Sequence, residues 1–184
     1  MNLLRTRRFL PLFLTQFLGA FNDNVFKNAL VVLLTFHAAH WTALAPGLVA
    51  NLAAGLFILP FFLFSATAGQ LADKFDKARL ARLVKVLEMG IMLVAGLGFW
   101  LESLAWLMAA LFLLGTHSTL FGPIKYALLP QHLHETELVG GNALVEAGTF
   151  VAILLGTLGG GLLAAAGQPL WVAACGLVIA VAGY

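Results

Sequence analysis

Charged residues are scarce in this 184-residue sequence, at 10%, whereas 61% of its residues are hydrophobic. A soluble domain usually carries about 25% charged residues, so the polar side chains here are too few to cover a water-soluble globule. The formal net charge is only +2, which gives no reason to expect a nucleic-acid partner. The single cysteine, Cys175, excludes an intramolecular disulfide and leaves the redox compartment open.

Long apolar runs make up most of the sequence, and the mean hydropathy is +0.98. Each run has the length of about 20 residues that crosses a bilayer core as a helix. The runs are continuous, whereas the strands of a membrane barrel alternate over about 10 residues. The sequence therefore predicts an all-α integral membrane protein. Six transmembrane helices are expected, roughly over residues 9–37, 47–71, 80–101, 104–127, 142–166 and 168–184.

The placement of the basic residues predicts how these helices are oriented. Lys and Arg lie before the first helix, in the second connection and beside the fourth, whereas the connections near His40, Glu102 and Gly167 hold none. By the positive-inside rule the N-terminus and the second and fourth connections are cytoplasmic. The sixth run is short for a full span and no tail follows Tyr184, so we expect a fragment. A second three-helix unit is expected to open near Leu104.

A polar stretch, residues 21–28, interrupts the first expected helix. Ionisable groups at this depth cost about 2.5 kcal/mol or more, so they normally face a bundle interior or a water-filled cavity. Asp23 and Lys27 lie four residues apart and share a helix face, as do Asn24 and Asn28. We interpret the stretch as the lining of a substrate pathway; the alternative is an ion pair that only holds helices together. The helix is expected to be tilted or irregular there.

The second connection carries the run GQLADKFDKAR, which starts at Gly69 and resembles the major facilitator signature G-x-L-a-D-r-x-G-r-k. Gly69, Asp73, Lys74 and Lys77 match the signature, and Asp76 replaces its second glycine. A small residue allows close helix approach, and an aspartate at a helix end can meet the dipole of a helix N-terminus. In that superfamily the loop latches the two halves and gates the cytoplasmic side, so the four matching residues are predicted to be a gate. An ordinary positive-inside loop is the alternative.

Two further ionisable residues lie near the ends of later helices. Lys125 follows Pro123, which interrupts the hydrogen-bond ladder of the fourth helix, and Gly122, which loosens that helix; its ammonium could bind a phosphate. Snorkelling of Lys125 to the inner headgroups fits the sequence equally well. Glu146 lies four residues after Asn142 and could bind a proton, a cation or a basic partner, or anchor an interhelical hydrogen bond.

Other ionisable residues give weaker signals. Glu88 follows Lys85 by one turn and is expected to pair with it, and His117 is a candidate cavity residue, although a satisfied core histidine is commoner. The sequence carries no convincing metal-ligand set, no phosphate-binding glycine loop, no nucleophile elbow and no paired catalytic carboxylates. A non-enzyme without metal or cofactor is therefore expected.

Together these features resemble the bacterial lysophospholipid transporter family, a branch of the major facilitator superfamily. The resemblance is carried by residues 16–24, 72–77, 123–126, 142–147 and 152–160. It implies the N-terminal six-helix half of a twelve-helix transporter that moves lysophospholipids, such as lysophosphatidylethanolamine, across the bacterial inner membrane by alternating access. The implied partners are membrane lipids, the lysophospholipid and the C-terminal six-helix half. The start of the chain also resembles transporters fused to acyltransferase domains.

On this resemblance the substrate-binding residues are Asp23, Asn24, Lys27, Lys125 and Glu146. Asp23 would meet an ammonium group and Lys125 a phosphodiester, while Phe- and Leu-rich flanks would hold the acyl chain. Two alternatives stay open. One is a general major facilitator exporter of drugs or small solutes, because the loop motif is common to that superfamily. The other is a membrane anchor for a fused acyltransferase.

Overall fold

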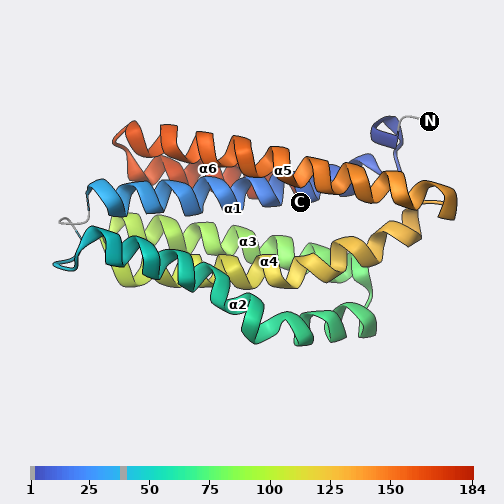
Figure 1. The fold of residues 1–184 in the computed structure, drawn as a ribbon, viewed down its shortest axis with the longest axis horizontal. Coiled ribbons are helices and arrows are strands. Elements are labelled where there is room, and N and C mark those ends of the chain that lie inside the picture. The colour runs from blue at the N-terminus through green and yellow to red at the C-terminus, as the bar shows by residue number, and fades with distance from the viewer. Residues whose placement is uncertain (1–2, 38–40) are drawn as a thin grey trace.

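The computed structural model describes residues 3–37 and 41–184 as a bundle of six long helices preceded by one short 3-10 turn (Figure 1). Each apolar run of the sequence forms one of them, which confirms the all-α prediction for the described part of the chain. The 3-10 turn covers Leu3–Arg5. The helices are α1 (Leu10–Phe36), α2 (Pro46–Lys74), α3 (Lys77–Trp100), α4 (Leu104–His132), α5 (Glu135–Ala165) and α6 (Pro169–Ala182).

The predicted boundary between the fourth and fifth helices was wrong. α4 continues past residue 127 to His132, and α5 begins at Glu135 instead of residue 142. The reason is a local cap at the start of α5, in which the Glu137 carboxylate accepts a hydrogen bond from the His134 backbone N–H at 3.0 Å. This arrangement starts the helix in polar sequence, ahead of the apolar run from which the boundary was inferred.

The polar stretch of α1 and Pro123 of α4 both lie inside continuous helices. A proline removes one backbone hydrogen bond, but packing from neighbouring helices can hold a membrane helix together across it. The polar groups of α1 satisfy one another locally: the Asn24 and Asn28 side chains donate to the carbonyl oxygens of Ala20 and Asn24 at 2.8 Å each.

Four helices, α2 to α5, are long and apolar enough to cross a membrane. α6 is apolar but has only 14 residues, and α1 has polar residues at its centre. The chain is therefore a multi-pass membrane protein by the length and composition of its helices. α1 lies inside this bundle, where its polar residues Asn22, Asp23 and Asn24 are buried.

The helices pack in a pattern that repeats after three helices. α1 packs on α5 and α4 on α2; α3 packs on α4 and α6 on α1; and α3 and α6 pack on each other. Exchanging α1 with α4, α2 with α5 and α3 with α6 leaves this set of packed pairs unchanged. Such exchange is expected of two three-helix repeats, as in the halves of major facilitator transporters. Figure 1 shows α1, α5 and α6 on one side of the bundle and α2, α3 and α4 on the other.

Glycines bring the two central polar helices close to their neighbours. A Cβ atom at Gly156 of α5 would lie 2.6 Å from the Phe21 carbonyl oxygen of α1. A Cβ atom at Gly115 of α4 would lie 2.2 Å from the Phe57 carbonyl oxygen of α2. Small residues at such contacts let helix backbones approach closely in a membrane. The contacts fix α1 against α5 and α4 against α2, which sets the positions of the polar side chains on α1 and α4.

One end of the bundle collects the basic residues and is called the basic end below. It carries the N-terminal segment and the α2–α3 and α4–α5 turns (Figure 1). Arg8 joins these parts, because its guanidinium lies 2.6 Å from Glu137 of α5 and donates to the His132 carbonyl oxygen at 3.2 Å. The basic residues of this end are Arg5, Arg7, Arg8, Lys74, Lys77, Arg79 and Arg82.

Candidate functional site

A cavity of about 340 Å³ lies between α1, α2, α4 and α5. Its polar side chains come from α1, α4 and α5, and its aromatic side chains include Phe57 and Phe61 of α2. Three of the five residues predicted to bind substrate line it: Asp23, Asn24 and Lys125. The full lining is Gln16, Gly19, Ala20, Asp23, Asn24, Phe57, Phe61, His117, Ser118, Phe121, Gly122, Lys125, Tyr126, Thr149 and Ile153.

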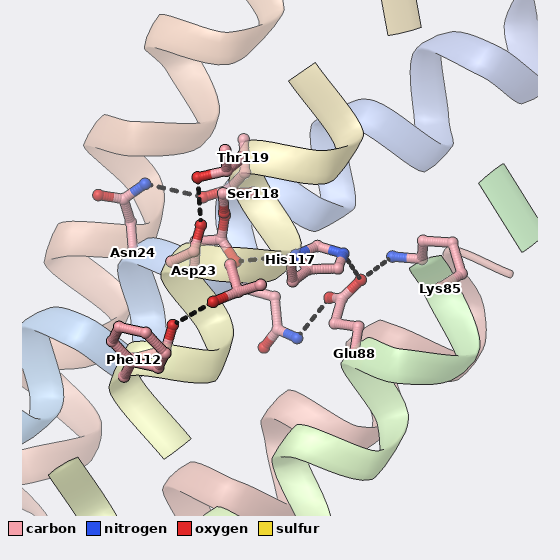
Figure 2. A network of polar contacts seen from close by, with 12 residues as sticks. Asp23, Asn24, Lys85, Glu88, Phe112, His117, Ser118 and Thr119 are labelled. Carbon is pink, nitrogen blue, oxygen red and sulfur yellow. Dashed lines mark hydrogen bonds and ion pairs between the residues drawn. The ribbon is translucent and has the colours of Figure 1, made fainter. Parts of the chain in front are cut away.

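Asp23 is held at the junction between this cavity and the interior of the bundle. One carboxylate oxygen accepts a hydrogen bond from the Ser118 hydroxyl of α4. The other oxygen lies 3.7 Å from Nδ1 of His117, also on α4. Figure 2 shows Asp23 pointing from α1 toward these two α4 residues. The carboxylate therefore remains within reach of a ligand in the cavity while it contacts a buried histidine.

Behind Asp23 a chain of buried ionisable side chains runs to α3 (Figure 2). Nε2 of His117 lies 3.2 Å from Oε2 of Glu88, and the Lys85 ammonium donates to the same carboxylate oxygen. Asn22 donates to the other oxygen of Glu88 at 2.7 Å. The exposed fractions are 2% for Lys85 and His117 and 0% for Glu88. The predicted pairing of Glu88 with Lys85 is confirmed, but the pair is buried and continues to His117.

The remaining two predicted substrate residues lie outside the cavity lining. Lys27 donates to the Asn24 side-chain oxygen at 2.9 Å, and its ammonium lies 5.0 Å from the centre of the Phe57 ring. It makes no ion pair with Asp23 within the part of the chain that the structure describes. Glu146 accepts a hydrogen bond from the Tyr126 hydroxyl. Both residues thus contact groups that line the cavity, Asn24 and Tyr126, without lining it themselves.

Lys125 lies two helical turns after Ser118 on α4, toward the basic end. The cavity lining includes it, and its ammonium lies 4.8 Å from the centre of the Tyr126 ring. It is half-buried and makes no ion pair within the described residues. An ammonium in this position can bind an anionic group that enters the cavity.

The predicted gate lies at the turn between α2 and α3. Asp76 begins α3, and its carboxylate accepts a hydrogen bond from the Arg79 backbone N–H at 2.8 Å. This N-cap explains why an aspartate replaces the signature glycine. Asp73 and Lys74 are exposed, and the described residues give Asp73 no hydrogen bond or ion pair.

Some cavity residues were missed by the sequence interpretation. Gln16 of α1 and Thr149 of α5 both line the cavity, and the Thr149 hydroxyl donates to the Gln16 side-chain oxygen at 3.0 Å. Ser118 binds Asp23 from α4. Each is an uncharged polar residue within a long apolar helix, and Ser118 belongs to the polar run of residues 116–119. Only the depth of such a residue in a membrane helix could have indicated a role. No group of three His, Cys, Asp or Glu residues that could hold a metal occurs in the described ranges.

The fold and the cavity define an all-α, multi-pass membrane protein built around an internal polar site, the architecture of a membrane transporter. No protein-family model matches the chain, and no solved structure matches it. The chain is 32% identical over 155 residues to the lysophospholipid transporter LplT of Salmonella heidelberg, covering 84% of this chain and 36% of that protein. It is 30% identical over 179 residues to LplT of Serratia proteamaculans, covering 97% of this chain and 42% of that protein.

These similarities extend over most of the chain, and they support an LplT-like family. The chain spans about two fifths of the length of these curated relatives, from 36% to 42%. A second Salmonella relative, from Salmonella newport, is also named lysophospholipid transporter LplT and is 32% identical over 156 residues.

Proposed function

We propose that this chain is the N-terminal six-helix half of a major facilitator transporter that moves lysophospholipids across the bacterial inner membrane by alternating access. The similarity to proteins named lysophospholipid transporter supports the substrate class. The observation that carries the proposal is the cavity between α1, α2, α4 and α5, which has an acidic group and a basic group in one apolar enclosure.

The lining of the cavity matches the parts of a zwitterionic lysolipid such as lysophosphatidylethanolamine. Asp23 offers a carboxylate for the ammonium, and Lys125 offers an ammonium for the phosphodiester. Lys125 lies seven residues after Ser118, the partner of Asp23, which is a rise of about 10 Å along α4. The headgroup would lie between the two, with its phosphate toward Lys125. Phe57, Phe61 and Ile153 supply apolar surface for the start of the acyl chain.

In this proposal Lys27 and Glu146 act through residues that line the cavity, and they do not touch the ligand themselves. Asn24 lines the cavity, and its side-chain oxygen is occupied by Lys27. Glu146 holds the Tyr126 hydroxyl, and the Tyr126 ring lies beside the Lys125 ammonium. The two ionisable residues would thereby position Asn24 and Lys125.

The predicted gate fits a chain that works with a second six-helix half. Gly69, Asp73, Lys74 and Lys77 lie at the α2–α3 turn of the basic end, where Asp73 and Lys74 are exposed. We assign to this turn the contact that closes the cytoplasmic side against the C-terminal half. The basic end would then face the cytoplasm, with the N-terminus inside, as the positive-inside rule requires.

The test is uptake of labelled lysophosphatidylethanolamine by spheroplasts that lack their own lysolipid transporter. Cells that express the full-length gene should accumulate the lipid, and cells with the empty vector should not. A parallel assay with labelled soluble solutes separates the general exporter alternative. Uptake no greater than the vector control, with the protein present in the membrane by immunoblot, would contradict the proposed substrate. Solute movement in the same cells would then favour the exporter.

A further inference from the structure

The buried chain from Asp23 to Lys85 has an uneven charge. Asp23 and Glu88 are two carboxylates, and among residues 3–37 and 41–184 Lys85 is the one ammonium within ion-pair distance of either. With a neutral His117 the four groups sum to one negative charge. With His117 as an imidazolium they sum to zero. An unbalanced charge inside a membrane bundle is costly, so the cluster favours one further positive charge.

His117 is placed to hold that charge as a proton. Its ring is 98% buried, with one nitrogen facing Asp23 and the other facing Glu88 (Figure 2). Neither ring nitrogen makes a well-aligned hydrogen bond within the described residues, and one oxygen of Asp23 is likewise unpaired. Two carboxylates on opposite sides of an imidazole stabilise its protonated form, in which both nitrogens are donors.

The substrate proposed above supplies an alternative positive charge at the same place. An ammonium group bound by Asp23 from the cavity would also bring the sum of the cluster to zero. If His117 stayed protonated while the ammonium was bound, the cluster would carry one excess positive charge. The ligand and the proton therefore compete, although the ligand binds at Asp23 and the proton binds at His117.

We propose that Asp23, His117, Glu88 and Lys85 form a proton-binding site that releases one proton when the ammonium headgroup of a lysolipid binds. The inference rests on the proposed function and adds an exchanged ion to it. The N–H bond at Nε2 of His117 breaks, and its proton passes to Glu88 and then to water. The Asp23 carboxylate stays ionised and changes its partner from the imidazolium to the headgroup.

The proton has a route that does not cross the bound headgroup. Lys85, at the far end of the cluster, also lines a second cavity of about 290 Å³ toward the basic end. Arg82, His132 and Tyr184 line that cavity too. The cluster thus has the substrate cavity at Asp23 and a separate cavity at Lys85. Lys85 can release one of its own protons to water in the second cavity and take the proton of Glu88 in its place, so that the ammonium is restored and one proton leaves the cluster.

The other ionisable side chains near the cluster have partners elsewhere. Lys27 of α1 contacts Asn24 and the Phe57 ring, Glu146 of α5 contacts Tyr126, and Lys125 of α4 lies beside the Tyr126 ring. α6 contributes only Cys175 as a titratable residue, and the charged residues of α2 lie at its end in the α2–α3 turn. The groups that face His117 at ion-pair distance are therefore Asp23 and Glu88.

The experiment counts protons released when lysophosphatidylethanolamine binds to the purified full-length protein. Binding heats measured in two buffers of different ionisation enthalpy give this number directly. We expect release of about one proton per lipid at a pH where His117 is protonated, and an affinity that rises with pH by up to about tenfold per unit. Lysophosphatidylglycerol carries the phosphate and chain but no ammonium, so its binding should release none.

Two variants assign the proton to the cluster. His117→Gln should abolish proton release and remove the rise of affinity with pH. His134→Asn is the matched control, because it removes an exposed histidine and keeps an acceptor at the start of α5; its proton count should equal that of the wild type. If His117→Gln does not fold by size-exclusion chromatography, His117→Asn replaces it, with the same expected loss.

The outcomes separate this inference from the proposed function. Lysophosphatidylethanolamine that binds without proton release across pH 5 to 9, roughly the range of a perturbed histidine, would overturn the exchange and leave the transport proposal standing. Release that persists in the His117→Gln protein would also overturn it. Absence of any lysolipid binding would overturn the function, and the exchange with it.

Discussion

A Cβ atom on Gly160 of α5 would lie 2.4 Å from the Val25 carbonyl oxygen of α1. Neither backbone can move aside easily, because α1 and α5 meet along a row of such contacts. We therefore expect Gly160→Ala to destabilise the bundle by about 1–3 kcal/mol, the usual cost of overpacking. The neighbouring Gly161 has nothing within 4 Å of a Cβ, so Gly161→Ala is the matched control.

The measurement for this pair is the midpoint of thermal unfolding of the detergent-purified protein. Gly160→Ala should lower the midpoint, while Gly161→Ala should leave it unchanged or raise it, because alanine favours the helix. Equal midpoints for the two variants would mean that α1 and α5 do not meet as closely as described.

The buried pair of Lys85 and Glu88 gives a prediction about stability. Glu88→Gln alone leaves the Lys85 ammonium buried without its carboxylate, and such removal typically costs about 3–5 kcal/mol. The double variant Lys85→Gln/Glu88→Gln removes both charges and should be much milder. Thermal unfolding of the two variants decides the matter. A double variant that is less stable than Glu88→Gln would show that the two side chains do not form a mutually dependent buried pair.

The orientation in the membrane can be tested with two equally exposed positions. Phe75 lies at the basic end and Leu101 at the opposite end, and each exposes 48% of its surface. In a cysteine-free background, a membrane-impermeant maleimide should label Leu101→Cys but not Phe75→Cys in intact spheroplasts. Both should react after permeabilisation. Labelling of Phe75→Cys in intact spheroplasts would place the basic end outside and reverse the proposed topology.

The helices themselves could be predicted from sequence because bilayer thickness sets the length of an apolar run. The bounds of α1 were within one residue of the prediction of 9–37. The start of α5 was not, because residues 135–141 contain three polar residues and two glycines and are helical owing to the cap formed by His134 and Glu137. A local hydrogen-bond arrangement of this kind does not change the hydropathy of the sequence, so hydropathy does not predict it.

The candidate site could be predicted only in part. Asp23, Asn24 and Lys125 stand out because charged or amide groups are rare in apolar runs, and all three line the cavity. The link from Asp23 through His117 to Glu88 joins residues on three helices. Spacing along the sequence does not reveal contacts between separate helices, so Glu88 and Lys85 read as an ordinary pair one turn apart.

The central claim is that Asp23 and Lys125 bind the two charges of a lysolipid headgroup. Its most direct test is the uptake rate of lysophosphatidylethanolamine and lysophosphatidylglycerol by spheroplasts that express wild type, Asp23→Asn or Lys125→Met at equal levels. A lost hydrogen bond to a charged group costs about 1.5–3 kcal/mol, or roughly 10- to 100-fold. We predict that Lys125→Met slows uptake of both lipids by this factor, and that Asp23→Asn slows only lysophosphatidylethanolamine. Unchanged uptake of both lipids in both variants would contradict the account.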